Sequence, residues 1–111
     1  MSAPIDLDHL NRYVFGDAAL LAEVLGIFRE QVETLAGEMN PSMDSEGWHL
    51  AAHTLKGAAR GVGAWALGDA AERAEKVTDA TPEERAAALK SIVDLAATAA
   101  DYAGELIGRA A

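Results

Sequence analysis

The sequence predicts an all-α fold, an up-and-down antiparallel four-helix bundle with a short additional N-terminal helix. Alanine is abundant, only 5% of the residues are aromatic, and no stretch alternates apolar and polar residues as a half-buried strand would. Apolar residues instead recur at helical spacing in four long segments that short turns separate. With 111 residues, 50% of them apolar, the chain is long enough for one hydrophobic core and too short for two. We therefore expect a single domain over residues 1–111.

The first two helices have distinct start and stop signals. A short helix is expected over residues 5–14. Asp17 is a suitable N-cap for a long second helix, because its carboxylate can accept hydrogen bonds from free backbone N–H groups. This helix should continue to about Met39, and Pro41 breaks the chain in the turn over residues 40–47. Its apolar stripe consists of Leu21, Val24, Leu25, Phe28, Val32, Leu35 and Met39.

Two further helices are expected over residues 45–62 and roughly 64–79. Gly61 and Gly63 mark the end of the first of these, since glycine favours the left-handed conformation that commonly ends a helix. Only a short turn can separate the two helices, which predicts that they are antiparallel neighbours.

The last helix begins at the sequence TPEE, residues 81–84. Thr81 is its N-cap, and a glutamate follows three residues later. The helix runs toward Gly108 on an apolar stripe of Leu89, Ile92, Val93, Ala96, Ala103, Leu106 and Ile107. We expect the largest contributions to the core, roughly 1.5–3 kcal/mol for each buried side chain, from Trp48, Trp65, Phe28 and the leucines.

Charge and cysteine content argue against several functions. Nine basic and eighteen acidic residues give a net charge of −9, which disfavours nucleic acids and anionic membranes as partners. The absence of cysteine excludes disulfides, thiolate metal sites and cysteine nucleophiles. No segment is apolar over the length of a membrane span, and the N-terminus lacks the basic start of a signal peptide. We therefore expect a soluble, cytoplasmic protein that is a monomer.

The third predicted helix has two parallel stripes. One is apolar and suits the seam of a bundle, with Trp48, Ala52, Leu55, Ala59 and Val62. The other is polar and lies beside the seam, with His49, His53, Lys56 and Arg60.

Gly57 lies one helical turn after His53 in this polar stripe. A glycine inside a helix costs about 1 kcal/mol relative to alanine, so its presence needs a reason. Without a side chain at this position, a partner or an anionic group can approach the imidazole. Lys56 and Arg60 can then neutralise a phosphoryl group. The set suits a histidine that accepts and donates phosphate as a covalent nucleophile.

A metal site is an alternative function for the two histidines. His49 and His53 are four residues apart, a spacing that can bind zinc. The zinc-protease motif requires a glutamate directly after the first histidine, where this chain has Leu50. Two cations on the same stripe would also repel a metal ion. We expect no metal site and no cofactor in the protein itself.

The central motif of the chain is AAHTLKGAARGVGAWAL, residues 51–67. It closely resembles the signature of histidine-containing phosphotransfer (HPt) domains, whose active helix reads approximately A-H-x-L-K-G-x-x-x-x-x-G-A-x-x-L. Residues 16–31, GDAALLAEVLGIFREQ, are similar to the second helix of that family. The resemblance extends over about the whole chain and implies a helical bundle that works in a phosphorelay.

The resemblance also implies a role for each matching residue. His53 would be phosphorylated on Nε2, Lys56 would contact the phosphoryl group, and Gly57 would leave room for the docking receiver domain. Glu75, 22 residues after His53, matches the position from which many members orient the histidine through Nδ1. Arg60 is less regular in the family, and we expect it to be auxiliary or to pair with an acidic residue of the receiver.

The resemblance makes the protein a phosphoryl carrier and not an enzyme. We find no P-loop or other nucleotide-binding motif. The phosphoryl group would come from an aspartyl phosphate on a response-regulator receiver domain, and the receiver would supply the Mg²⁺. Receivers and hybrid histidine kinases are the expected partners of a stand-alone phosphotransfer protein. The candidate docking surface for the receiver consists of Leu20, Val24, Ile27 and His49.

Two other functions stay open. One is a helical adaptor domain of the same fold that binds signalling proteins without being phosphorylated. The intact set of His53, Lys56 and Gly57 argues against it, because such an adaptor has little reason to keep all three. The other is a dimerising kinase domain, in which an acidic residue normally follows the histidine. Here that residue is Thr54.

Overall fold

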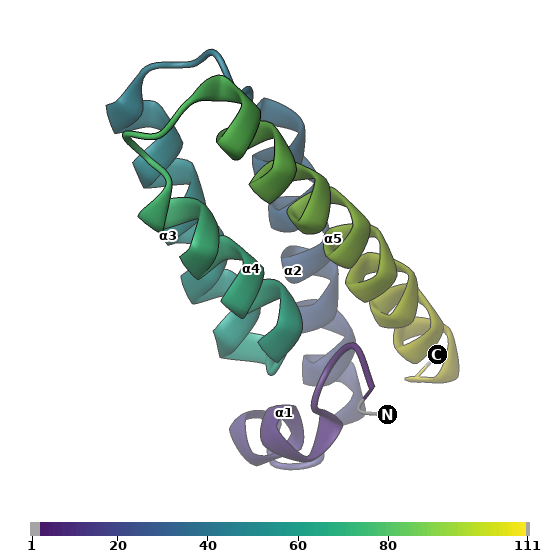
Figure 1. The fold of residues 1–111 in the computed structure, drawn as a ribbon. Helices are drawn as coiled ribbons and strands as arrows, with labels where there is room; N and C mark the ends of the chain where they lie inside the picture. The colour runs from purple at the N-terminus through teal and green to yellow at the C-terminus, as the bar shows by residue number, and fades with distance from the viewer. Residues whose placement is uncertain (1–2, 111) are drawn as a thin grey trace.

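The computed structural model describes residues 3–110 and confirms the all-α fold (Figure 1). Its helices are α1 (Leu7–Val14), α2 (Ala18–Glu38), α3 (Ser45–Val62), α4 (Trp65–Lys76) and α5 (Pro82–Ala110). The four longer helices form an up-and-down bundle, in which each packs against two neighbours in the ring α2–α3–α4–α5. The short helix α1 lies across one end of this bundle, against α2 and α3.

Side-chain caps fix where the helices begin. Asp17 accepts a hydrogen bond from a backbone N–H in the first turn of α2, as the sequence predicts, and Asp44 does the same for α3. Thr81 caps α5 in the same way. The first helix begins two residues later than predicted, because Asp6 is its N-cap.

The turn between α3 and α4 requires a glycine. Gly63 has a φ of 83°, in the left-handed region that glycine adopts without a steric penalty. A Cβ at this position would lie 2.9 Å from the Cβ of Asp6, whose N–H donates to the carbonyl oxygen of Gly63 over 2.9 Å. This close approach attaches the segment before α1 to the turn. Gly61 lies inside α3, so only Gly63 of the two expected glycines ends the helix.

The two tryptophans have different environments. Trp48 is fully buried, and its Nε1–H donates to the carbonyl oxygen of Ala74 over 2.8 Å. Trp65 is 43% exposed, and its Nε1–H donates to the carboxylate of Asp6 over 3.1 Å. The prediction that Trp65 belongs to the core was wrong, because its indole instead holds the capping residue of α1 at the surface. Val93, predicted on the apolar stripe of α5, is also exposed.

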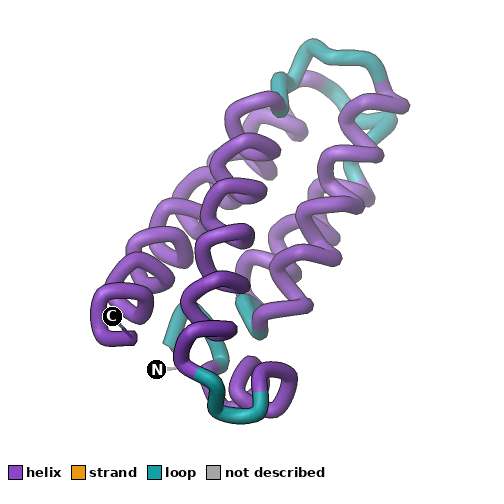
Figure 2. The backbone as a smooth tube through the Cα atoms, turned by 180° about the vertical axis from the view of Figure 1, so that it is seen from behind, coloured by secondary structure: helices purple, strands orange, loops and turns teal. Residues whose placement is uncertain are grey.

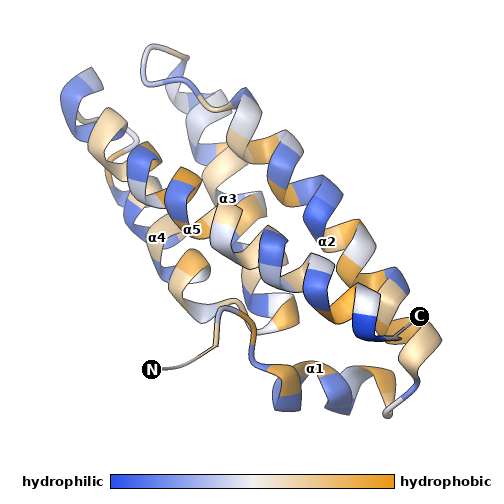
Figure 3. Ribbon diagram, turned by 90° about the vertical axis from the view of Figure 1, so that its right-hand side faces the viewer, coloured by the Kyte–Doolittle hydropathy of each residue, from blue (hydrophilic) through white to orange (hydrophobic). Residues whose placement is uncertain are grey.

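The connections lie at the two ends of the bundle. Seen from behind in Figure 2, the α2–α3 and α4–α5 loops lie together at one end, while the α3–α4 turn and α1 lie at the other. In Figure 3, apolar and hydrophilic residues alternate around each helix, as amphipathic helices with one face in a core require. Within the described residues, no helix combines the length and apolarity needed to cross a membrane.

A buried arginine links the two loops at the first end. Arg85 of α5 is 6% exposed and donates hydrogen bonds to the carbonyl oxygens of Pro41, Met43 and Thr78. Its guanidinium carbon also lies 5.0 Å from the ring centre of Trp48. This side chain therefore satisfies backbone acceptors of both loops and packs over the largest residue of the core.

We predict that Arg85→Ala lowers the free energy of unfolding by about 2–3 kcal/mol, because it leaves three partly buried carbonyl groups without their donor. Urea unfolding followed by circular dichroism measures this change. Lys90→Ala, an exposed substitution on the same helix, should change stability by no more than about 0.5 kcal/mol. Equal stability of the two variants would show that the hydrogen bonds of Arg85 to the two loops do not stabilise the fold.

Candidate functional site

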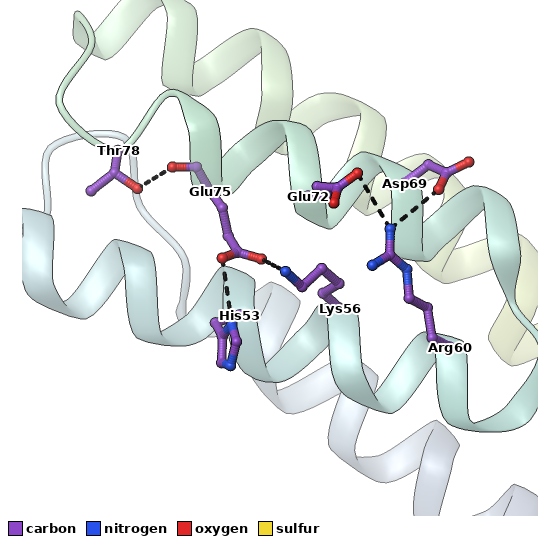
Figure 4. Close-up of polar contacts among 7 residues, drawn as sticks. All are labelled: His53, Lys56, Arg60, Asp69, Glu72, Glu75 and Thr78. Carbon is purple, nitrogen blue, oxygen red and sulfur yellow. Dashed lines mark hydrogen bonds and ion pairs between the residues drawn. The ribbon is translucent and has the colours of Figure 1, made fainter.

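Three residues of the polar stripe of α3, His53, Lys56 and Arg60, face acidic side chains of α4 (Figure 4). His53 Nδ1 lies 3.4 Å from Oε2 of Glu75, and Lys56 Nζ lies 2.6 Å from Oε1 of the same residue. One carboxylate on α4 thus contacts both side chains of α3, each through a different oxygen atom. The helical spacing of three residues between His53 and Lys56 is what brings them to the same carboxylate.

The surroundings of Glu75 keep it ionised. Its side chain is 14% exposed, whereas that of His53 is 62% exposed. Contact with Lys56 is the largest of the effects that lower the pKa of Glu75; His53 lowers it further, and burial acts in the opposite direction. The end of α4 is secured by Thr78, whose hydroxyl donates to the backbone carbonyl of Glu75 over 2.6 Å.

This arrangement prepares one nitrogen of His53 for chemistry. An anionic carboxylate beside Nδ1 favours the imidazole tautomer that has its proton on Nδ1. The lone pair then resides on Nε2. Because most of the His53 side chain is exposed, a phosphoryl donor can reach this nitrogen from solvent. The geometry is that of an oriented, accessible nucleophile.

Gly57 leaves open space beside His53. A Cβ built at Gly57 would have no neighbour within 4 Å, and the same is true of Gly61 one turn later. Packing within the chain therefore does not explain either glycine. The two residues form a strip of exposed backbone on the outer side of α3, continuous with the turn that presents His53.

Arg60 lies two turns from His53 and pairs with α4. Its Nη2 atom lies 3.3 Å from the carboxylate of Glu72 and 3.5 Å from that of Asp69. The side chain passes over Gly68, where a Cβ would lie 2.9 Å from the Cγ of Arg60. The structure thus places Arg60 in a second set of ion pairs between the same two helices.

An apolar groove of about 360 Å³ lies beside the glycine strip, between α1, α2 and α3, and Gly61 is part of its lining. Leu20, Val24 and Ile27 of α2 line it, as do residues of α1 and α3. Leu20 is 39% exposed and Ile27 is 59% exposed. His49, the fourth residue predicted for docking, does not line the groove. Its ring lies nearly parallel to that of His53, with 6.0 Å between the ring centres and 15° between the planes.

Comparison with known proteins identifies the family. The Hpt domain family matches residues 20–105. This chain belongs to the Hpt family. Its fold is similar to the crystal structure of the histidine phosphotransferase ShpA from Caulobacter crescentus, with 39% sequence identity and a TM-score of 0.62. The match covers 93% of this chain and 97% of that one. A search of curated proteins found no match.

Membership fixes the general role of this Hpt protein. Hpt domains are phosphocarriers and not kinases, and they work with receiver and kinase partners in phosphorelays. The role of this chain is therefore phosphotransfer within a two-component phosphorelay.

Sequence reasoning did not identify several residues that line the groove. The groove also includes Tyr13 of α1, and Ala58 and Gly61 of α3. The sequence of α1 could have indicated that Tyr13 lines the groove only if the position of α1 across the end of the bundle were known. Asp69 and Glu72 were also missed as partners of Arg60. Among residues 3–110, no three His, Asp or Glu side chains gather as a metal site would require.

We predict that Glu75→Ala weakens the preference of neutral His53 for the Nδ1–H tautomer, because the variant lacks the carboxylate that accepts this proton. Long-range ¹H–¹⁵N NMR spectra near pH 8 report the tautomer directly. Glu72→Ala is the matched control, since Glu72 is a carboxylate of the same helix that contacts Arg60. Identical His53 spectra in wild type and Glu75→Ala would contradict the assigned role of Glu75.

Proposed function

We propose that His53 is the phosphoryl acceptor of this Hpt protein, taking phosphate from a receiver aspartate and passing it to the aspartate of another receiver. The observation that supports this proposal is the pairing of an exposed imidazole with a partly buried carboxylate, which directs the reactive nitrogen outward. Receivers and hybrid histidine kinases are the partners.

The transfer step involves no oxidation or reduction. The lone pair of His53 Nε2 attacks the phosphorus atom of the aspartyl phosphate, the N–P bond forms, and the P–O bond to aspartate breaks. The aspartate leaves as a carboxylate. The proton on Nδ1 stays beside Glu75, whose negative charge offsets the positive charge that develops on the ring. The reverse step returns the phosphoryl group to a second receiver.

The neighbouring residues act on binding and charge. Lys56, one turn from His53, contacts the phosphoryl group when its ammonium moves from Glu75 toward the arriving anion. Gly57 allows the backbone of α3 to approach the receiver closely. Arg60 is auxiliary: it stabilises the α3–α4 pair or meets an acidic side chain of the receiver. The receiver supplies the Mg²⁺, and this chain needs no cofactor of its own.

The charge of the chain also bears on its partners. A net charge of −9 suits neither nucleic acid nor an anionic membrane as a partner. We propose a cytoplasmic, monomeric, single-domain carrier without an ATP site or enzymatic activity of its own. Leu20, Val24 and Ile27 form the docking surface for the receiver, and His49 extends it beside the acceptor.

His53→Gln is expected to abolish labelling when the protein is mixed with ³²P-labelled phospho-receivers and Mg²⁺, because the variant lacks the acceptor nitrogen. The label on the wild type should be lost in acid and kept in base, as a phosphoramidate bond requires. Lys90→Gln, on an exposed site of α5, should be labelled like the wild type. Absence of label from every receiver tested, with a folded protein, would favour the unphosphorylated adaptor instead.

Ile27→Asp should slow transfer from the receiver by about tenfold or more, because it places a charge in the apolar groove where the receiver packs. Ile27 is 59% exposed, so the helical circular dichroism should not change. Val93→Asp is the matched control, since Val93 is 47% exposed on α5 and lies outside the groove. Equal transfer rates for the two variants would remove the groove from the docking surface.

A further inference from the structure

The cations beside His53 are already engaged in the unphosphorylated protein. Lys56 pairs with Glu75 at 2.6 Å, and Arg60 pairs with both Asp69 and Glu72. In this cluster on α3 and α4, three carboxylates thus pair with two positively charged side chains. A dianionic phosphoryl group arriving on His53 therefore enters a region with no surplus of positive charge.

His49 differs from these cations in being exposed and outside the ion pairs found among residues 3–110. It lies one turn before His53, and the two rings are stacked with 6.0 Å between their centres. Histidine is the side chain whose charge changes closest to neutral pH. At this separation, a doubly charged anion on His53 would markedly favour the charged form of the second imidazole.

We infer that phosphorylation of His53 is coupled to protonation of His49, whose imidazolium then neutralises and hydrogen-bonds the phosphoryl group. The inference rests on the proposed function of His53. The N–P bond forms as described above, and the proton that His49 gains comes from solvent. His49 is therefore a positioning and charge-supplying residue beside the acceptor, and it does not itself accept phosphate.

Other charged groups around this part of α3 do not account for the coupling. Glu46 lies on α3 three residues before His49. The elements that pack near this end of α3 carry Glu38 on α2, Glu75 and Lys76 on α4, Asp79 in the following loop and Arg85 on α5. All of these charges are present both before and after phosphorylation. The phosphoryl group is the charge that is added, and the movement of Lys56 from Glu75 toward it offsets part of that charge. The change in the proton affinity of His49 therefore reports the net effect of the two.

The sign of the pH dependence follows from this difference. Because the phosphorylated state binds the His49 proton more tightly, the coupling stabilises phospho-His53 at the acidic side of the His49 titration. This stabilisation is lost as the pH rises through the titration of the phosphorylated form.

The first test follows the His49 ring by NMR between pH 6 and 9, with potassium phosphoramidate as the phosphoryl donor. We expect the titration midpoint of the His49 resonances to move to higher pH by about one unit in the phosphorylated protein. His9, on α1, should titrate at the same pH in both states. An unchanged His49 midpoint in protein phosphorylated at His53 would overturn the inference and leave the proposed function standing. Failure of any donor to phosphorylate His53 would overturn both.

The second test compares His49→Gln and His49→Lys in the transfer equilibrium with a receiver. Dividing the equilibrium constant of the wild type by that of each variant removes the pH dependence of the receiver. For His49→Gln, this ratio should be up to about ten at low pH and should approach one as the pH rises. His49→Lys should keep its phosphohistidine favourable across the range, because its charge does not titrate there. A wild-type pH profile in His49→Gln would overturn the inference.

Discussion

The site depends on the register between α3 and α4, which a buried hydrogen bond from Trp48 to Ala74 fixes. The indole N–H reaches the carbonyl oxygen of Ala74 over 2.8 Å, and the next residue is Glu75. Five residues after the tryptophan, α3 presents His53. A shift of one residue along α4 would turn the carboxylate by more than a quarter of a turn away from the imidazole. An unmet indole N–H in the core would oppose such a shift, so the core sets the geometry of the exposed site.

Small side chains bring α3 and α4 close enough together for the polar residues of the two helices to meet. The face between the two helices is built largely from alanine, with Ala52 and Ala59 on α3 and Ala71 and Ala74 on α4 fully buried. Such residues let helix axes approach closely, and the side chain of Glu75 is then long enough to reach two partners on α3 at once. At Gly68 the same principle allows the stem of Arg60 to pass over α4. The small residues between α3 and α4 therefore account both for the close packing of the two helices and for the polar contacts at their surface.

The helices could be predicted from the sequence because their boundaries depend on local chemistry. Asp17 and Thr81 cap helices where expected, since a cap acts within one turn of its own residue. Glu75 could be assigned only through the family resemblance, because 22 residues of spacing do not by themselves determine how two helices meet. Trp65 was predicted wrongly because its hydrogen-bond partner, Asp6, is 59 residues away. The α4 partners of Arg60 were missed for the same reason: each depends on the packing of elements that single-sequence patterns do not place.

The balance of charge around His53 suits a carrier better than a storage site. A pocket with a large surplus of cations would hold a phosphoryl group tightly and slow its return to a receiver. In the proposed function, Lys56 leaves Glu75 in order to meet the phosphoryl group, so the loss of this ion pair offsets part of the attraction to the phosphate. The carboxylate released in this exchange still faces Nδ1 of His53 and gains importance as the ring becomes more positive. In the proposed mechanism, the shared carboxylate would thus moderate binding of the phosphate while supporting the nucleophile, which would keep transfer in both directions accessible.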